Sequence, residues 1–207
     1  VIHAALEQYI RLQRKTLKGK GQIDGKGQVI FADFDKKRPV YQFDLTNLKK
    51  NIVEPLRKGY EERKVRCELD LAFTKEWKPC DWMASNVYVR LKMDVMHIVG
   101  DKTVVTDWKT GRFKPEEEFD DQLSAYAVGA LSAGFGEETS ARLIFTDEGQ
   151  VVNTDAGNLT RIQLPKAQKE WDKRAKKMLT DTMFVPKPAM HCRWCPYSAN
   201  KGGPCKF

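Results

Sequence analysis

Two aspartates and a lysine stand near the ends of two adjacent predicted strands between Tyr88 and Gly111. Apolar and polar residues alternate along the first of these strands, which is typical of a half-buried strand, and Asp94 falls on its polar face. The turn Gly100-Asp101 leads into a second strand that ends with Asp107 and Lys109. Because these two residues are two positions apart, their side chains leave the same face of the strand. The hairpin therefore predicts that two carboxylates and one ammonium converge.

Such a set of groups suits the hydrolysis of a phosphodiester bond. Carboxylate oxygens from Asp94 and Asp107 are the hard ligands that Mg²⁺ or Mn²⁺ prefers. Lys109 cannot ligate a metal while it is protonated, so we assign it to catalysis. It would orient or help to deprotonate the attacking water and offset negative charge on the phosphate. A surface ion pair is the alternative explanation of the same residues.

An aspartate, a hairpin and then Asp-x-Lys together resemble the core of the PD-(D/E)XK nuclease superfamily. Three further segments follow the order of its RecB-like, CRISPR-associated iron-sulfur branch: an opening helix with His3, the segment Gln122-Leu-Ser-Ala-Tyr126, and a cysteine-rich tail. The resemblance implies that His3 joins the metal site, which would favour Mn²⁺ somewhat over Mg²⁺. It also implies that Gln122 and Tyr126, one helical turn apart, position the DNA strand. A helix face packed against the sheet is the alternative for these two residues.

Residues 65–73 also alternate and predict a third strand beside the hairpin, with the apolar residues on one face: Val65, Cys67, Leu69, Leu71 and Phe73. In the RecB-like branch a glutamate occupies the corresponding strand, so the resemblance implies that Glu68 is a catalytic carboxylate. An exposed strand residue is the alternative. Arg90 and Lys92 share the polar face with Asp94, and we expect them to contact DNA phosphates.

The tail carries three cysteines that suit a metal in a reducing cell better than disulfides: Cys192, Cys195 and Cys205. The resemblance implies a structural [4Fe-4S] cluster whose fourth ligand is a cysteine ahead of the helical histidine. No cysteine precedes His3, so the fourth ligand would lie upstream of Val1, or Cys80 or His191 would replace it. A zinc site with three cysteines and one histidine is the alternative, and unligated thiols are a third reading. Because the sequence starts inside the helical motif, we expect further residues upstream.

The charge balance favours a polyanionic partner. The 207 residues include 36 Lys and Arg against 28 Asp and Glu, a formal net charge of +8, and neutralising phosphates with such residues releases counterions. No apolar run approaches the length of a membrane helix. We therefore expect a soluble, cytoplasmic protein that binds DNA and no membrane.

The patterns together predict an α/β fold, a mixed central sheet flanked by helices in a single nuclease domain over residues 1–207. Within it, residues 1–17 form the helix carrying His3, residues 64–134 the catalytic core and residues 186–207 the cysteine-rich tail. We expect further helices at 46–64, with Thr46 as N-cap and a break near Pro55, at 115–131 with an acidic first turn, and at 164–178. Further strands are expected at 29–34, 40–43, 141–146 and 150–154, and loops at 18–27 and 74–85.

The function expected from this set is metal-dependent DNA cleavage by an exonuclease that serves recombination, repair or phage DNA processing. A chain of this size without helicase motifs would thread free DNA ends itself or depend on a helicase or recombination partner. A nucleic-acid-binding module with the same fold is the alternative. A site-specific restriction endonuclease would share the core, but it would not account for the segment at 122–126 or the cysteine tail.

Overall fold

The computed structural model describes residues 2–11, 21–23, 29–31, 48–183, 185 and 188–206. The expected strand at 40–43, the N-cap at Thr46 and the later part of the first helix lie outside these residues. The chain divides into two compact units, residues 1–168 and 169–207. None of the described helices combines the length and the apolar character needed to span a bilayer.

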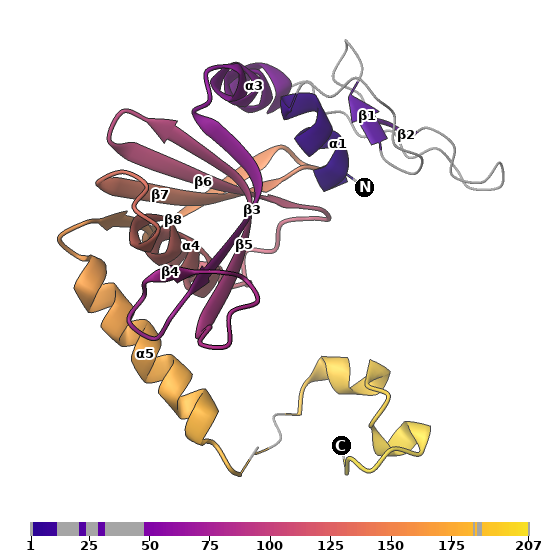
Figure 1. Ribbon diagram of the computed structural model, residues 1–207. Coiled ribbons are helices and arrows are strands. Elements are labelled where there is room, and N and C mark those ends of the chain that lie inside the picture. The colour runs from indigo at the N-terminus through magenta and orange to yellow at the C-terminus, as the bar shows by residue number, and fades with distance from the viewer. Residues whose placement is uncertain are drawn as a thin grey trace. The chain divides into compact units, whose positions relative to one another are not determined.

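A six-stranded mixed sheet forms the centre of the first unit (Figure 1). Its strands lie in the order β4-β3-β5-β6-β7-β8, with the bounds β3 Val65–Phe73, β4 Pro79–Cys80, β5 Val89–Val99, β6 Lys102–Lys109, β7 Glu138–Phe145 and β8 Gln150–Thr160. Every neighbouring pair is antiparallel except β6 and β7, which run parallel and are joined through helix α4, Asp120–Ser132. A separate two-stranded sheet pairs β1, Gly21–Ile23, with β2, Val29–Phe31. The predicted α/β class with a mixed, helix-flanked sheet is confirmed.

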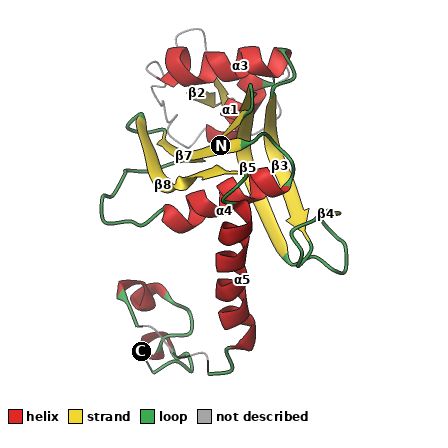
Figure 2. Ribbon diagram, turned by 90° about the vertical axis from the view of Figure 1, so that its left-hand side faces the viewer, coloured by secondary structure: helices red, strands yellow, loops and turns green. Residues whose placement is uncertain are grey.

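Helices cover both faces of the sheet (Figures 1 and 2). On one face, α1 (Ile2–Ile10), the π-helix Lys49–Val53 and α3 (Glu54–Glu61) contribute to a first apolar cluster, which includes Leu6, Ile10, Val53, Leu56, Val95 and Trp108. On the other face, α4 contributes to a second apolar cluster, which includes Leu123, Tyr126, Met93, Met96 and Leu143. Full burial of each large aliphatic side chain stabilises the fold by about 1.5–3 kcal/mol, so these two clusters fix the helices on the strands.

Two predicted helix bounds differ from the structure. The first helix, expected to reach residue 17, ends at Ile10 with Arg11 in a turn, and residues 12–17 lie outside the described part of the chain. The helix expected from Pro115 begins at Asp120, because the preceding residues form a turn in which Glu117 N–H donates to the Lys114 carbonyl. Its acidic first turn therefore consists of Asp120 and Asp121. The expected break near Pro55 is the change from π-helix to α3, where proline occupies the first turn and its missing N–H is tolerated.

The second unit contains most of α5, Leu164–Thr180, and the cysteine-rich tail. The tail forms two short 3₁₀ helices, Met190–Trp194 and Ala199–Lys201, and one isolated bridge between Ser198 and Cys205. The helix predicted at 164–178 is thus confirmed and extends two residues further. The tail has little regular structure, so local turns set the positions of its cysteines.

Candidate active site

Asp94 lies at the point where β5 and β6 stop pairing. Their antiparallel register runs from Val99↔Lys102 back to Val95↔Thr106 and ends there. Just beyond this point the Trp108 backbone N–H donates to Asp94 Oδ2 at 2.8 Å. A side-chain carboxylate therefore takes the place of a backbone carbonyl in the ladder. This contact fixes Asp94 beside the strand that carries Asp107 and Lys109.

The neighbouring strand β3 is irregular at the same level of the sheet. Glu68 has a left-handed backbone with φ of +52°, and the β3–β5 register passes over it and Asp94, with the flanking pairs Cys67↔Val95 and Leu69↔Met93. The first of these pairs packs in the first apolar cluster and the second pair in the second cluster. The prediction that the apolar residues of each strand keep to one face is therefore wrong at this step. In β3 the left-handed Glu68 interrupts the alternation.

Asp107 is the most enclosed group of the site, with 6 % of its surface exposed. Its Oδ1 accepts a hydrogen bond from the Tyr126 hydroxyl at 2.6 Å and a longer one from Gln122 Nε2 at 3.4 Å. Gln122 also donates to the Tyr126 oxygen at 2.9 Å. Gln122 and Tyr126 thus contact Asp107 in the structure. Their contact with DNA stays a prediction. Burial, followed by the charge of Asp107, raises the pKa of Tyr126 well above that of a free tyrosine.

The second oxygen of Asp107 faces Lys109. Lys109 Nζ lies 2.8 Å from Oδ2 as an ion pair, and its side chain is 30 % exposed. Oδ2 is itself buried, and no other described group donates to it. The ion pair with Lys109 therefore compensates the buried charge of this oxygen, since burial of a charge is unfavourable unless a partner offsets it. The predicted pairing of Asp107 and Lys109 on one face is confirmed.

His3 reaches the site from α1. Its Nδ1 lies 3.8 Å from Asp94 Oδ2, so the structure places the helical histidine beside the hairpin as predicted. Glu7, one turn further along the same helix, forms an ion pair of 2.9 Å with Arg11. Sequence reasoning missed Glu7, although its spacing of four residues from His3 was a usable signal.

The pKa values of two carboxyl groups of the site are raised above their ordinary values. Burial raises the pKa of Asp94, and the charge of Asp107 adds to this, while the Trp108 N–H opposes it. Burial likewise raises the pKa of Glu68, with further contributions from the charges of Asp94 and Glu7. Glu68 therefore lies within electrostatic reach of the predicted site. Carboxyl groups whose pKa is raised by burial and by neighbouring negative charge are a feature of functional sites.

Arg90 and Lys92 are held by groups other than Asp94. Arg90 Nε donates to the Trp82 carbonyl at 2.9 Å, and its guanidinium lies 5.6 Å from the centre of the Trp82 ring. Lys92 Nζ lies 5.4 Å from the same ring and 3.3 Å from Asp70. Both cations thus lie against the Trp82 ring. Their contact with DNA stays a prediction.

The cysteines provide no complete metal site in the part of the chain that the structure describes. No group of three or more His, Cys, Asp or Glu side chains that could hold a metal ion occurs in this part, at the tail or elsewhere. Cys192 and Cys195 share a turn in which the Cys195 N–H donates to the Cys192 carbonyl at 3.1 Å, and all five cysteines are free thiols. The expectation of an iron-sulfur cluster therefore gains no support from the geometry. Cys67 is buried, which raises the pKa of its thiol to about 11, and we regard it as a core residue.

Removing the Tyr126 hydroxyl should weaken the fold through Asp107. In a Tyr126→Phe protein, Oδ1 keeps only the long contact from Gln122, so we expect the free energy of unfolding to fall by about 1.5–3 kcal/mol. Urea denaturation measures this change. Tyr197→Phe, at a position that is 65 % exposed, is the control and should stay within about 0.5 kcal/mol of wild type. Equal stabilities of the Tyr126→Phe protein and wild type would contradict the role given to this hydrogen bond.

Comparison with known proteins gives one family. The sequence model of the PD-(D/E)XK nuclease superfamily matches residues 1–200. No curated protein matches the chain. Six solved chains match it, among them the crystal structure of SSO0001, which is 16 % identical with a TM-score of 0.39 and covers 78 % of this chain. The match spans 64 % of the length of that protein.

Proposed function

Because the chain belongs to the PD-(D/E)XK nuclease superfamily, we propose that it is a divalent-metal-dependent deoxyribonuclease, and more narrowly an exonuclease. The observation that carries the proposal is the convergence of Asp94, Asp107 and Lys109 at the point where β5 and β6 part. The net charge of +8 supports a polyanionic substrate.

The described residues fit Mg²⁺ or Mn²⁺ as far as a protein needs to supply ligands. Asp94 and Asp107 provide two carboxylates, and Oδ2 of Asp107 is a buried oxygen that faces the Lys109 ammonium. Mg²⁺ is commonly bound by one or two carboxylates, with water and substrate phosphate oxygens completing the shell, so no third side chain is required. When bound, such a cation supplies charge neutralisation at the phosphate and lowers the pKa of a water.

The protein's own residues would divide the remaining work. Lys109 can hold the attacking water and neutralise charge on the phosphate, since its ammonium lies at the surface of the site beside Asp107. Gln122 and Tyr126 fix the orientation of Asp107 by hydrogen bonds to one of its oxygens. His3 and Glu68 lie near Asp94 and would serve as further metal ligands or proton carriers.

The exonuclease assignment rests on motif order. His3, the Asp-x-Lys strand, the Gln122–Tyr126 segment and the cysteine tail follow the order of the RecB-like iron-sulfur branch. Within the same proposal the enzyme acts in the cytoplasm in recombination, repair or phage DNA processing, alone on free ends or with a helicase. A cluster or zinc ion in the tail would be structural and needs a ligand beyond the three cysteines. Iron and zinc analysis with an anaerobic absorbance spectrum tests that part separately.

Cleavage of end-labelled DNA tests the proposal. Linear and closed-circular substrates, single- and double-stranded, are incubated with Mg²⁺, Mn²⁺ or EDTA. We expect metal-dependent loss of linear DNA by wild type and none by Asp107→Asn, while circles survive. Asp101→Asn, in the exposed turn at the far end of the hairpin, is the matched control and should cut normally. If wild type binds DNA but cuts nothing with either metal, the binding-module alternative replaces the nuclease. If circles are cut, it is an endonuclease.

A further inference from the structure

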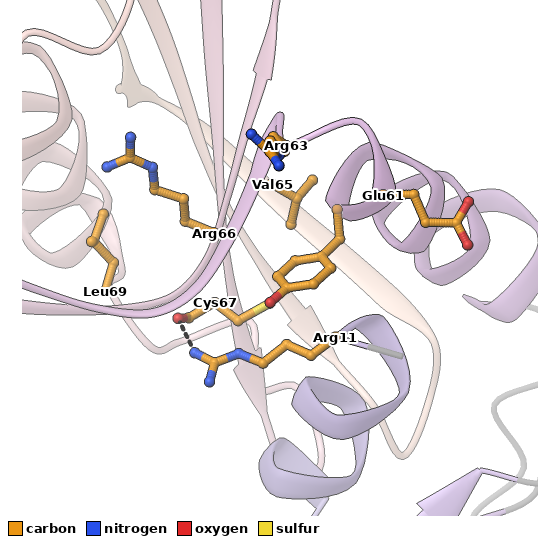
Figure 3. Close-up of a pocket in the computed structure, with 8 residues that line it drawn as sticks. Arg11, Glu61, Arg63, Val65, Arg66, Cys67 and Leu69 are labelled. Carbon is orange, nitrogen blue, oxygen red and sulfur yellow. Dashed lines mark hydrogen bonds between the residues drawn. The ribbon is translucent and has the colours of Figure 1, made fainter. Parts of the chain in front are cut away.

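A pocket of about 730 Å³ lies along the open edge of β3, beside the residues that flank Glu68 (Figure 3). Cys67 and Leu69 both line it. Of the described strands, only β4 pairs with this edge of β3, and it does so only at Ala72 and Phe73. The pocket therefore adjoins the proposed active site from the β3 side of the sheet.

The side chains around this pocket carry an excess of positive charge. Three arginines line it: Arg11, Arg63 and Arg66. Arg11 is committed to Glu7 and to the Cys67 carbonyl, to which its Nη2 donates at 2.5 Å. Arg63 and Arg66 are exposed and form no ion pair with any residue that the structure describes. Glu61 is the one carboxylate among the described lining residues, and it points away from all three guanidinium groups in Figure 3.

The aromatic ring of Phe135 holds the guanidinium group of Arg66 in place. The group lies 4.9 Å from the centre of the Phe135 ring, within the range of a cation–π contact. Such stacking uses one face of the planar guanidinium and leaves its edge N–H groups available. Those donors suit the bidentate recognition of a phosphate.

Arg63 keeps its position at the expense of backbone strain. Its φ is +59°, and it follows α3 in a turn where Arg63 N–H donates to the Tyr60 carbonyl and Lys64 N–H to the Gly59 carbonyl. This is the arrangement in which glycine usually ends a helix, because a left-handed conformation is unfavourable for residues with a Cβ. A non-glycine residue in such a position is a reason to look for a function of its side chain.

We infer that this pocket binds the sugar-phosphate backbone of the DNA strand next to the cleavage site, with Arg63 and Arg66 as positioning residues. Arg66 precedes Glu68 by two residues, about 7 Å along the strand, so a phosphate held there lies near the carboxylates. The inference rests on the proposed function, since it names the track by which the substrate of that site is held.

Replacing Arg63 with glycine separates binding from folding. The change removes a phosphate contact and relieves the left-handed strain, so we expect weaker DNA binding together with a melting temperature about 2–4 °C higher. At 0.15 M salt one lost contact should lower affinity about fivefold and reduce the salt slope by about 0.7–0.9. Arg66→Gln should likewise weaken DNA binding and reduce the salt slope. The measurement is fluorescence anisotropy with labelled single- and double-stranded 20-mers in EDTA and in Ca²⁺, over a salt series.

Lys102→Gln, at the opposite end of β6 from Lys109, is the charge-matched control and should leave the salt slope unchanged. Unchanged affinity and slope in the Arg63→Gly, Arg66→Gln double variant would overturn the inference, as would a wild-type protein that binds neither DNA. Cleavage by wild type and Asp107→Asn is measured on the same preparations. Cleavage that depends on Asp107 while both arginines are dispensable refutes the strand track alone. Arginine-dependent binding without cleavage refutes the nuclease alone.

Discussion

A Lys109→Met protein should bind Mn²⁺ more tightly than wild type and cleave DNA about 10²–10⁴-fold more slowly. Lys109 lies 2.8 Å from Asp107 Oδ2, so its ammonium competes with any cation for that oxygen. Removing the ammonium frees the carboxylate for metal. The same change removes the group that holds water and neutralises the phosphate, so cleavage is lost although the metal is present.

The metal-free form of this variant should also lose stability. Asp107 is almost fully buried, and an uncompensated charge in such a position reduces the free energy of unfolding by about 2–3 kcal/mol. Calorimetric Mn²⁺ titration, single-turnover cleavage and urea denaturation measure the three effects, with Lys102→Met as control. Weaker Mn²⁺ binding by the Lys109→Met protein would contradict the competition, and full cleavage would remove Lys109 from the mechanism.

An Asp94→Asn protein should be more stable than wild type at neutral pH without metal and less stable with it. The pKa of Asp94 is raised in the folded protein, so its ionised form opposes folding above that pKa. Because the unfolded chain loses this proton first, wild-type stability falls as pH rises through the window between the ordinary and the raised pKa. Asparagine keeps an acceptor for the Trp108 N–H and removes the charge. The gain should therefore be complete above the raised pKa and absent below about pH 4.

Thermal melts from pH 3.5 to 8, with EDTA or with 10 mM Mg²⁺, test this reversal. Metal that binds only the folded state stabilises wild type by about 2.7 kcal/mol at a concentration of one hundred times its Kd. The variant lacks one of two carboxylates and should respond little. If Asp94→Asn has the same stability as wild type in EDTA at every pH, the buried charge of Asp94 does not oppose folding. A full Mg²⁺ response by the variant would remove Asp94 from the ligand set.

The parts of the site whose residues follow the regular spacing of a strand or a helix could be predicted from the sequence. Strand alternation and the Gly100-Asp101 turn located the hairpin, and the two-residue spacing placed Asp107 and Lys109 on one face. The four-residue spacing of Gln122 and Tyr126 put both on one side of α4, where they meet Asp107. Each of these features depends only on geometry within one strand or helix.

The remaining features depend on contacts between segments or on single backbone angles, which carry no periodic signal. The left-handed conformation of Glu68 interrupts an alternation that looks unbroken in the sequence. The hydrogen bond from Arg11 to the Cys67 carbonyl beside the site arises only when α1 packs on β3. The start of α4 was placed too early because Pro115 and the acidic run after it mimic a helix start.

The connection between the parallel strands β6 and β7 sets an order of folding for the site. The β5–β6 hairpin closes between neighbours such as Val99 and Lys102, whereas the β6–β7 pair joins Lys102 with Glu138 across α4. Closing the longer loop costs more chain entropy, so the hairpin is expected to form first. The two aspartates then meet while both are still in water, and the arrival of Tyr126 on α4 encloses Asp107. The unfavourable desolvation of this carboxylate therefore falls late in folding, after much of the favourable apolar contact has been made.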